Sequence, residues 1–476
     1  MIVHYDQSPV GTGKTRRVIE KAVAHQARWL FAVQRHTAIE ELRLRLGNAA
    51  AAHHTEPKFE VIQSDKAMRG YSVRQAVEAL PEKYDRASHV IALCTHAALT
   101  MSDLRQFKRW HLVVDELPPA FSMQEIGSQR DEAFFREHFA LQHVHGRWSK
   151  ISCTEAGGEL DGSILRQDDS HQHLRLLHRR VLDSERFAER HVLCNLADWS
   201  EMTKPKLRWT WWDYFSVREL AAFDSIQFLA NGFLQSFPAR LWKLWEPGVE
   251  WREIKTHDDR RLEPRTVTIT WFDERRASKN MFGEPKGREA LDKIAAHIAK
   301  EAGVAKLIWS GNREVIEPFS KHLSVADYLT PKQAGANCWM DRTHAVMMYA
   351  AKPNRSVGAV LNALGVEEQD WIESEEYETI LQFVTRTSVR DVSSREHAHI
   401  YVFDRQQAEY LVRFFEAQPH IHPECRRVDL GLNLAPGRSG PKVRSMTPEE
   451  IETARVERNR KRAALEKNRR ARLKAA

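Results

Sequence analysis

The chain has 476 residues, with 72 Lys or Arg and 65 Asp or Glu, so its formal net charge is +7. At about 150 residues per domain, this length predicts about three domains with sizeable cores. The charge excess sits at one end: residues 441–476 hold 12 basic and 5 acidic side chains, whereas residues 1–440 hold 60 of each sign. A basic balance usually indicates nucleic acid or an anionic surface as partner, but here only the tail carries it.

The apolar residues and cysteines exclude several classes of protein. No apolar run approaches the ~18–20 residues that a membrane-spanning helix needs. The N-terminus lacks the basic start and long apolar stretch of a signal peptide. The five cysteines are isolated in sequence, which argues against a zinc ribbon or a disulfide framework and is typical of a reducing cytoplasm. We therefore expect a cytoplasmic chain with no membrane partner.

Short apolar runs alternate with helical patterns over residues 1–119, which predicts a parallel sheet with helices on both faces. Residues 120–224 are polar and rich in histidine and predict an insertion or accessory subdomain. The apolar run 226–230 predicts a return to the first sheet, which we expect to continue over 225–255. The predicted strands of this part are 2–5, 29–33, 59–62, 89–94 and 112–114, and the predicted helices are 14–26 and 37–46.

A second alternating block occupies residues 256–432 and predicts a second parallel sheet. Beyond it, residues 433–476 are expected to be a linker and a helical tail, because Thr447, Pro448 and Glu450 match the start of a helix. This tail is either a solvated helix or a basic arm that adds salt-sensitive affinity for nucleic acid. The predicted strands of the second block are 266–272, 305–310, 345–350 and 399–403, and the predicted helices are 291–301 and 406–415.

The first motif, SPVGTGKT at residues 8–15, lies between the first predicted strand and the first predicted helix. It fits the phosphate-binding pattern GxxxxGK[ST], with Ser8 in place of the first glycine. Gly11 and Gly13 let backbone N–H groups turn toward phosphate oxygens, and the helix starting at Lys14 directs its positive end at the anion. Lys14 would reach the β- and γ-phosphates, and the Thr15 hydroxyl would ligate Mg²⁺. The alternative is a glycine-rich turn with a chance Lys-Thr. The expected ATP contacts in this loop are Ser8, Gly11, Thr12, Gly13, Lys14 and Thr15.

The second motif is an acidic pair, Asp115 and Glu116, at the end of the apolar run 112–114. An acid at the carboxyl end of a strand can hold Mg²⁺ opposite the phosphate loop, and the next acid can polarise the attacking water. We assign Asp115 to the metal and Glu116 to the water. Alone the pattern is common at ordinary strand ends, but its position roughly 100 residues after the loop favours the functional interpretation.

Together, these motifs resemble those of the superfamily-two helicases of the DExD/H-box type, in which AxxGxGKT is followed by DE at this distance. The resemblance spans about 1–119 and 226–415 and implies two RecA-like α/β domains that bind ATP and Mg²⁺ and act on nucleic acid. The box reads Asp115-Glu116-Leu117-Pro118. Pro118 stands where the family usually has Asp or His, a residue that commonly helps to couple the two domains.

Residues 382–390 have the spacing QxxxRxxxR and resemble helicase motif VI, with one residue inserted between the arginines. In the family, these residues cross the cleft between the domains to the γ-phosphate, where an arginine stabilises charge that grows in the transition state. The resemblance implies that Gln382 contacts the nucleotide and that Arg386, Arg390 or both complete the catalytic site. The alternative is a helix with two solvated arginines four residues apart.

Further strand ends resemble helicase motifs that contact nucleic acid, which implies roles for Arg35, Thr95, His96 and Asn312. Each could instead be an ordinary helix cap.

Two other segments take the places of motifs III and V: Ala230 with Asn231, and Lys332 with Gly335 and Asn337. This pattern looks more like divergent phage or plasmid helicases, and a phage-encoded chain would act in the host cytoplasm.

Five aromatic residues lie between 209 and 215. They could stack on bases, but core packing is favoured because aromatics more often fill cores.

These observations predict an ATP-hydrolysing helicase or translocase that acts on DNA, single-stranded or duplex, or on RNA. A terminase-like packaging motor would need a nuclease domain with clustered acids after the ATPase. A third alternative is a nucleotide-gated binding protein without enzymatic activity. Either the insertion or the basic tail could recruit a protein partner.

Overall fold

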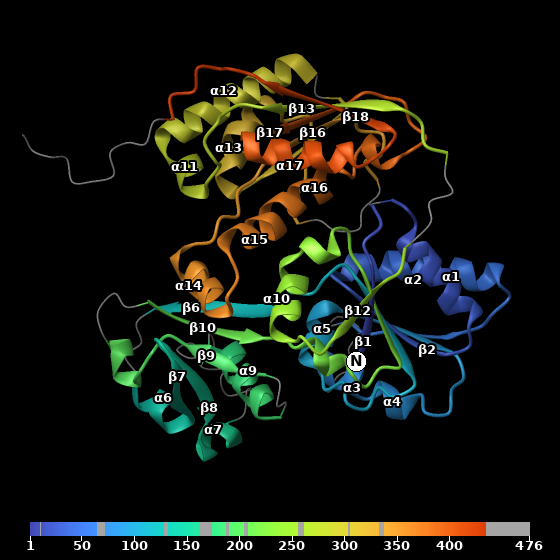
Figure 1. The fold of residues 1–476 in the computed structure, drawn as a ribbon, viewed down its shortest axis with the longest axis vertical. Helices are drawn as coiled ribbons and strands as arrows, with labels where there is room; N and C mark the ends of the chain where they lie inside the picture. The colour runs from blue at the N-terminus through green and yellow to red at the C-terminus, as the bar shows by residue number, and fades with distance from the viewer. Residues whose placement is uncertain are drawn as a thin grey trace, which may run out of the picture. The chain divides into compact units, whose positions relative to one another are not determined.

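The described residues form three β-sheets, and two of them are parallel (Figure 1). The predicted α/β class, with two parallel sheets and an insertion within the first, is confirmed. The predicted helical tail, 441–476, lies outside the residues that the structure describes, and so do Gly335 and Asn337. The computed structural model describes residues 1–9, 11–63, 72–127, 132–160, 174–186, 190–203, 208–255, 261–302, 305–332 and 338–434.

The first sheet has seven strands in the order β12-β1-β11-β5-β2-β4-β3, and all its neighbouring strands are parallel. β11 lies between β1 and β5, so the predicted return of residues 226–230 to this sheet is confirmed. The strands are β1 (Ile2–Asp6), β2 (Arg28–Val33), β3 (Lys58–Val61), β4 (Val90–Thr95), β5 (Trp110–Asp115), β11 (Ser225–Leu229) and β12 (Glu250–Glu253).

Both faces of this sheet are buried. Successive side chains of a strand point to opposite sides, so each strand contributes to two cores. In β2, Leu30 and Ala32 belong to one core cluster, whereas Phe31 and Val33 belong to the other. Helices α1 and α2 cover the second face, and α3, α4, α5 and α10 contribute to the first. The loops at the carboxyl ends of the strands therefore provide the place where a ligand can bind. The helices are α1 (Lys14–Ala24), α2 (His36–Ala52), α3 (Val73–Glu78), α4 (Leu80–Lys83), α5 (His96–Met101), η3 (Val217–Leu220), η4 (Phe233–Gln235) and α10 (Phe237–Trp245).

The insertion is an antiparallel sheet of five strands in the order β6-β10-β9-β8-β7. The aromatic run lies in β10, where Trp209 and Trp211 enter one core and Trp212 and Tyr214 the other. All four are buried, which confirms the expectation that they pack in a core. The elements are β6 (Phe121–Gly127), α6 (Glu132–His138), β7 (Phe139–His145), β8 (Trp148–Cys153), α7 (Glu155–Glu159), α9 (Arg175–Arg186), β9 (Val192–Cys194), η2 (Trp199–Thr203) and β10 (Arg208–Tyr214).

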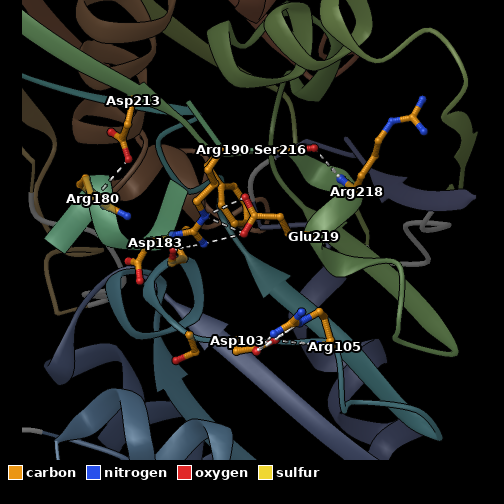
Figure 2. Close-up of polar contacts among 12 residues, drawn as sticks. Asp103, Arg105, Arg180, Asp183, Arg190, Asp213, Ser216, Arg218 and Glu219 are labelled. Atoms are coloured by element: carbon orange, nitrogen blue, oxygen red, sulfur yellow. Dashed lines mark hydrogen bonds and ion pairs between the residues drawn. The ribbon is translucent and has the colours of Figure 1, made fainter. Parts of the chain in front are cut away.

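A buried ion-pair network joins the insertion to the first sheet's helices (Figure 2). Arg190 donates from Nε to the two carboxylate oxygens of Glu219 at 2.9 and 2.8 Å, and from Nη2 to the carbonyl of Thr100 at 2.7 Å. Asp183 of α9 lies 3.6 Å from Arg190 Nη1 and accepts a 3.0 Å hydrogen bond from Arg74. Moving α9 away from α5 and η3 would leave buried charges without their partners, which is strongly destabilising. The network therefore stabilises the packing of α9 against α5 and η3.

The second parallel sheet has six strands in the order β15-β14-β16-β17-β13-β18. Helices α16 and α17 lie beside this sheet (Figure 1), and their apolar residues pack on one face of it. The strands are β13 (Arg265–Trp271), β14 (Leu307–Gly311), β15 (Asp327–Tyr328), β16 (His344–Met348), β17 (Ala398–Val402) and β18 (Ile421–Arg427). The helices are α11 (Lys279–Gly283), α12 (Pro285–Ala302), α13 (Arg313–His322), α14 (Arg355–Leu364), α15 (Glu368–Ile372), the π-helix η5 (Glu373–Tyr377), α16 (Glu378–Val384), η6 (Ser388–Arg390) and α17 (Arg405–Glu416).

Helix α14 follows β16 of the second sheet but packs elsewhere. Its residues Val360, Leu361 and Leu364 join the core cluster that covers one face of the first sheet. In addition, Ser356 Oγ donates a 2.5 Å hydrogen bond to Glu125 of β6. The segment between β16 and α16 therefore contacts both the first sheet's core and the insertion. Within the described ranges, no helix is both long and apolar enough to cross a membrane.

Candidate functional site

The loop between β1 and α1 has the backbone that a phosphate-binding turn requires. Gly11 and Gly13 have φ angles of 85° and 89°, in the left-handed region that favours glycine. Helix α1 begins at Lys14, as predicted. The Lys14 ammonium donates hydrogen bonds to the carbonyl oxygens of Ser8 and, at 3.1 Å, Pro9. The lysine is thus folded onto its own loop, and burial lowers its pKa.

The acidic pair lies directly beside this loop. Asp115 ends β5, and its Oδ1 accepts a 3.2 Å hydrogen bond from the Thr15 hydroxyl. The next residue, Glu116, has a φ of 67°, which is unusual for a residue with a side chain. Its backbone N–H donates to the Leu229 carbonyl of β11 at 2.9 Å, which fixes the sharp turn. Such backbone strain is often found at functional sites.

Burial changes the acidity of both carboxyl groups. Burial raises the pKa of Asp115, although the hydrogen bond from Thr15 opposes the change. For Glu116, burial and the charge of Asp115 raise the pKa to about 7, while the nearby Lys14 lowers it. A carboxylate with a pKa near neutrality suits proton transfer at physiological pH.

The oxygen atoms of Thr15 and Asp115 are hard ligands of the kind that Mg²⁺ prefers. Their 3.2 Å separation brings both to one point at the loop. Across the described part of the chain, no group of three or more His, Cys, Asp and Glu residues could hold a metal ion by itself. The two residues therefore fit a Mg²⁺ that takes its remaining ligands from phosphates and water, which is the usual arrangement for this ion.

Residues 256–432, which carry the second parallel sheet and are called the second half below, complete the cavity. It has a volume of about 390 Å³ and is lined by Gly11, Gly13, Lys14, Thr15, Asp115 and Glu116 from one side and by Gln382, Arg386 and Arg390 from the other. Gln382 Nε2 lies 3.4 Å from Glu116 Oε2, so the two sides are in contact. Ser8 and Thr12 do not line the cavity. Ser8 donates from its backbone N–H to Asp6, and the Thr12 hydroxyl donates to Pro9.

The two arginines differ in their surroundings. Arg386 is 4% exposed, donates from Nε to the Gln382 carbonyl at 3.1 Å, and has a buried Nη1 without a hydrogen-bond partner within the described residues. Burial and the neighbouring Arg35 and Arg390 lower its pKa to about 10. Arg390 is half-buried and lies in the field of Glu41 and Arg45. Arg386 thus has an unused donor beside the cavity.

Glu378 was not singled out from the sequence, although it lies close to the acidic pair. It is one helical turn before Gln382, so the i, i+4 spacing that puts both on one face was a usable signal. Its Oε1 accepts hydrogen bonds from Gln382 Nε2 and Asn231 Nδ2, both at 3.3 Å. Burial and the charge of Glu116 raise the pKa of Glu378 to about 8.

The residues predicted to contact nucleic acid lie in four different environments. The Thr95 hydroxyl caps α5 by accepting a hydrogen bond from Ala98 N. His96 is buried behind the acidic pair, 3.0 Å from the Asp115 carbonyl, and burial lowers its pKa to about 4. Asn312 is buried, and its amide bridges both backbone groups of Ala350. Arg35 is half-buried near Arg386. Their contact with nucleic acid stays a prediction.

No protein-family model matches the chain, and no curated protein matches it. Solved structures that are similar include S. tokodaii Xpd4, with 12% identity and a TM-score of 0.46 over 89% of this chain and 96% of that chain. S. cerevisiae Dbp5 bound to RNA and ADP BeF3 has 11% identity and a TM-score of 0.37, over 89% and 85%. The DUF1998 helicase MrfA bound to DNA has 9% identity and a TM-score of 0.37, over 90% and 48%. At these values the similarity concerns the fold alone.

Proposed function

We propose that this chain is an ATP-dependent nucleic-acid helicase or translocase of the superfamily-two type. The observation that carries the proposal is the cavity of about 390 Å³ in which the phosphate loop and the acidic pair face Gln382, Arg386 and Arg390. We infer that residues 1–119 with 225–255 form one motor domain and residues 256–432 the other. A nucleotide in the cavity would then contact both.

In this proposal each residue of the site has a separate role in ATP hydrolysis. Lys14 exchanges the carbonyls of Ser8 and Pro9 for phosphate oxygens. Thr15 and Asp115 hold the Mg²⁺ ion, which when bound neutralises charge on the phosphates. Glu116 orients the attacking water and accepts its proton.

An arginine from the second half stabilises the charge that develops on the γ-phosphate. Since Gln382 already contacts Glu116, binding and release of nucleotide would change how the two domains meet. Repeated opening and closing would move the second domain along DNA or RNA.

The first test is the ATPase activity of Lys14→Ala. We expect the purified variant to lose ATP hydrolysis, because no other residue in the loop can replace the ammonium. Lys21→Ala, an exposed lysine in the last turn of the same helix, is the matched control. Retained turnover in Lys14→Ala would overturn the assignment of the loop.

The second test measures wild-type ATPase activity with and without single-stranded DNA, double-stranded DNA and RNA, followed by a strand-displacement assay. A translocase is expected to be stimulated by the nucleic acid along which it moves. Hydrolysis that no nucleic acid stimulates would count against a translocase and would leave an ATPase of another kind.

A further inference from the structure

Polar side chains from three elements contact Glu378, the first residue of α16. Its Oε1 accepts hydrogen bonds from Asn231, which follows β11, and from Gln382 in α16 itself, both at 3.3 Å. Its Oε2 lies 3.5 Å from the hydroxyl of Tyr410 in α17. The carboxylate thus connects the first sheet's loop to two helices of the second half.

The hydrogen-bond partners of Glu378 are neutral, which distinguishes it from Glu373 and Glu375. Glu373 and Glu375, on the preceding turn, form ion pairs with Arg240 at 2.9 Å and with Lys332 at 2.6 Å. Glu378 is instead held by two carboxamides. A half-buried acid held by amides is costly to fold, and acids of this kind are concentrated at functional sites.

The position of Glu378 determines the orientation of the Gln382 carboxamide. Gln382 Nε2 lies 3.4 Å from Glu116 Oε2 and 3.3 Å from Glu378 Oε1. The NH₂ end of the Gln382 carboxamide faces both carboxyl groups and donates to each of them. The carbonyl oxygen Oε1 of Gln382 is therefore turned the other way, as an acceptor.

We propose that Glu378 is a positioning residue of the ATPase site: it fixes the Gln382 carboxamide so that Gln382 Oε1, together with Glu116, accepts hydrogen bonds from the attacking water. The proposal rests on the ATPase function proposed above. Glu378 itself touches neither the nucleotide nor the water. Its effect passes through Gln382, and Asn231 holds its carboxylate in place from the first sheet.

The kinetic test compares Glu378→Ala with Glu378→Gln. The alanine variant frees Gln382 to rotate, and we expect kcat to fall by about 10²-fold with little change in KM for ATP. The glutamine variant keeps an acceptor oxygen and should retain most of the activity. In a double-mutant cycle, Glu378→Ala should add little to the loss already caused by Gln382→Ala. Glu368→Ala, an exposed acid of α15, is the control. Additive losses, or no rescue by glutamine, would overturn the proposal.

A spectroscopic test separates this proposal from the ATPase function. In protein labelled with ¹⁵N-glutamine, the side-chain amide signal of Gln382 is identified by its disappearance in Gln382→Ala. We expect that signal to shift strongly in Glu378→Ala, and much less in Glu378→Gln or Glu368→Ala. An unmoved signal in Glu378→Ala would refute the contact even in an active enzyme. If the signal shifts in Glu378→Ala but the wild type hydrolyses no ATP, the contact between Glu378 and Gln382 is supported. The ATPase function and the catalytic use of that contact are then refuted.

Discussion

Arg386 and Arg390 line the same cavity, but only Arg386 combines deep burial with an unused donor, Nη1. We therefore predict that Arg386 is the arginine that stabilises the transition state. Arg386→Ala should lower kcat by about 10³-fold or more, whereas Arg390→Ala should have a smaller effect because its half-buried guanidinium lies in the field of Glu41 and Arg45. Steady-state kinetics with saturating ATP would measure both. A larger loss in Arg390→Ala would reverse the assignment.

Glu378 also predicts a pH dependence of stability. Its pKa rises from about 4.5 to about 8 in the folded protein because of burial and the charge of Glu116. Between these values the folded state binds more protons than the unfolded state, so the free energy of unfolding falls as pH rises. Glu378→Gln removes this titration.

The variant should therefore be more stable than wild type at pH 8.5, and the difference should vanish near pH 4.5. Thermal melts across this range would show it. Melting curves that stay parallel at every pH would show that Glu378 ionises as freely in the folded protein as in the unfolded chain.

Strand β10 shows what an aromatic cluster does at the scale of one element. Trp209 is fully buried in the core that it shares with Trp199 and Phe135. Trp209→Ala should therefore cost about 3–5 kcal/mol of stability through the cavity that it leaves. Urea unfolding would measure the loss. If the variant kept its stability and lost affinity for single-stranded DNA, Trp209 would be a base-stacking residue instead.

The inner strands of the two parallel sheets could be predicted because they are largely apolar and buried. The edge strands β12, β15 and β18 were not predicted, because most of their residues are polar and exposed. Residues 29–33, for example, were predicted as a strand and lie in β2, and the predicted strand 345–350 overlaps β16 over residues 345–348. The antiparallel sheet of the insertion was not predicted as a sheet. Most of β7 is exposed, so its sequence lacks the apolar run of a buried strand. Nor could the sequence show α14 packing against the first sheet's core, because its partners are distant in the chain.

The same distinction applies to the candidate site. The phosphate loop and the acidic pair were recognisable because their chemistry lies in short contiguous motifs, and the cavity contains both. Glu378 was missed because its role depends on Asn231, 147 residues away, and on an amide whose orientation only the fold sets. Thr95 was correctly suspected of an alternative role as a helix cap, because a threonine at a strand-to-helix junction is a common N-cap.

At the scale of the whole molecule, residues 1–440 and the tail, residues 441–476, differ in net charge. Residues 1–440 carry 60 basic and 60 acidic side chains, so their formal net charge is zero. Residues 441–476, with 12 basic and 5 acidic side chains, carry the entire excess. The site that we propose for ATP lies wholly within residues 11–390, so hydrolysis and electrostatic affinity for nucleic acid are predicted to be separable.

Deleting residues 441–476 should therefore weaken binding to nucleic acid without changing the basal ATPase rate. The slope of log K against log salt is negative. For every phosphate that the protein no longer neutralises, it becomes shallower by about 0.7 for a single strand and about 0.9 for a duplex. Fluorescence anisotropy at several salt concentrations would give both the affinity and the slope. A full-length variant with the twelve basic residues changed to glutamine separates charge from length, because it should behave like the deletion. Unchanged affinity at low salt in both variants would show that the tail is only a solvated end of the chain.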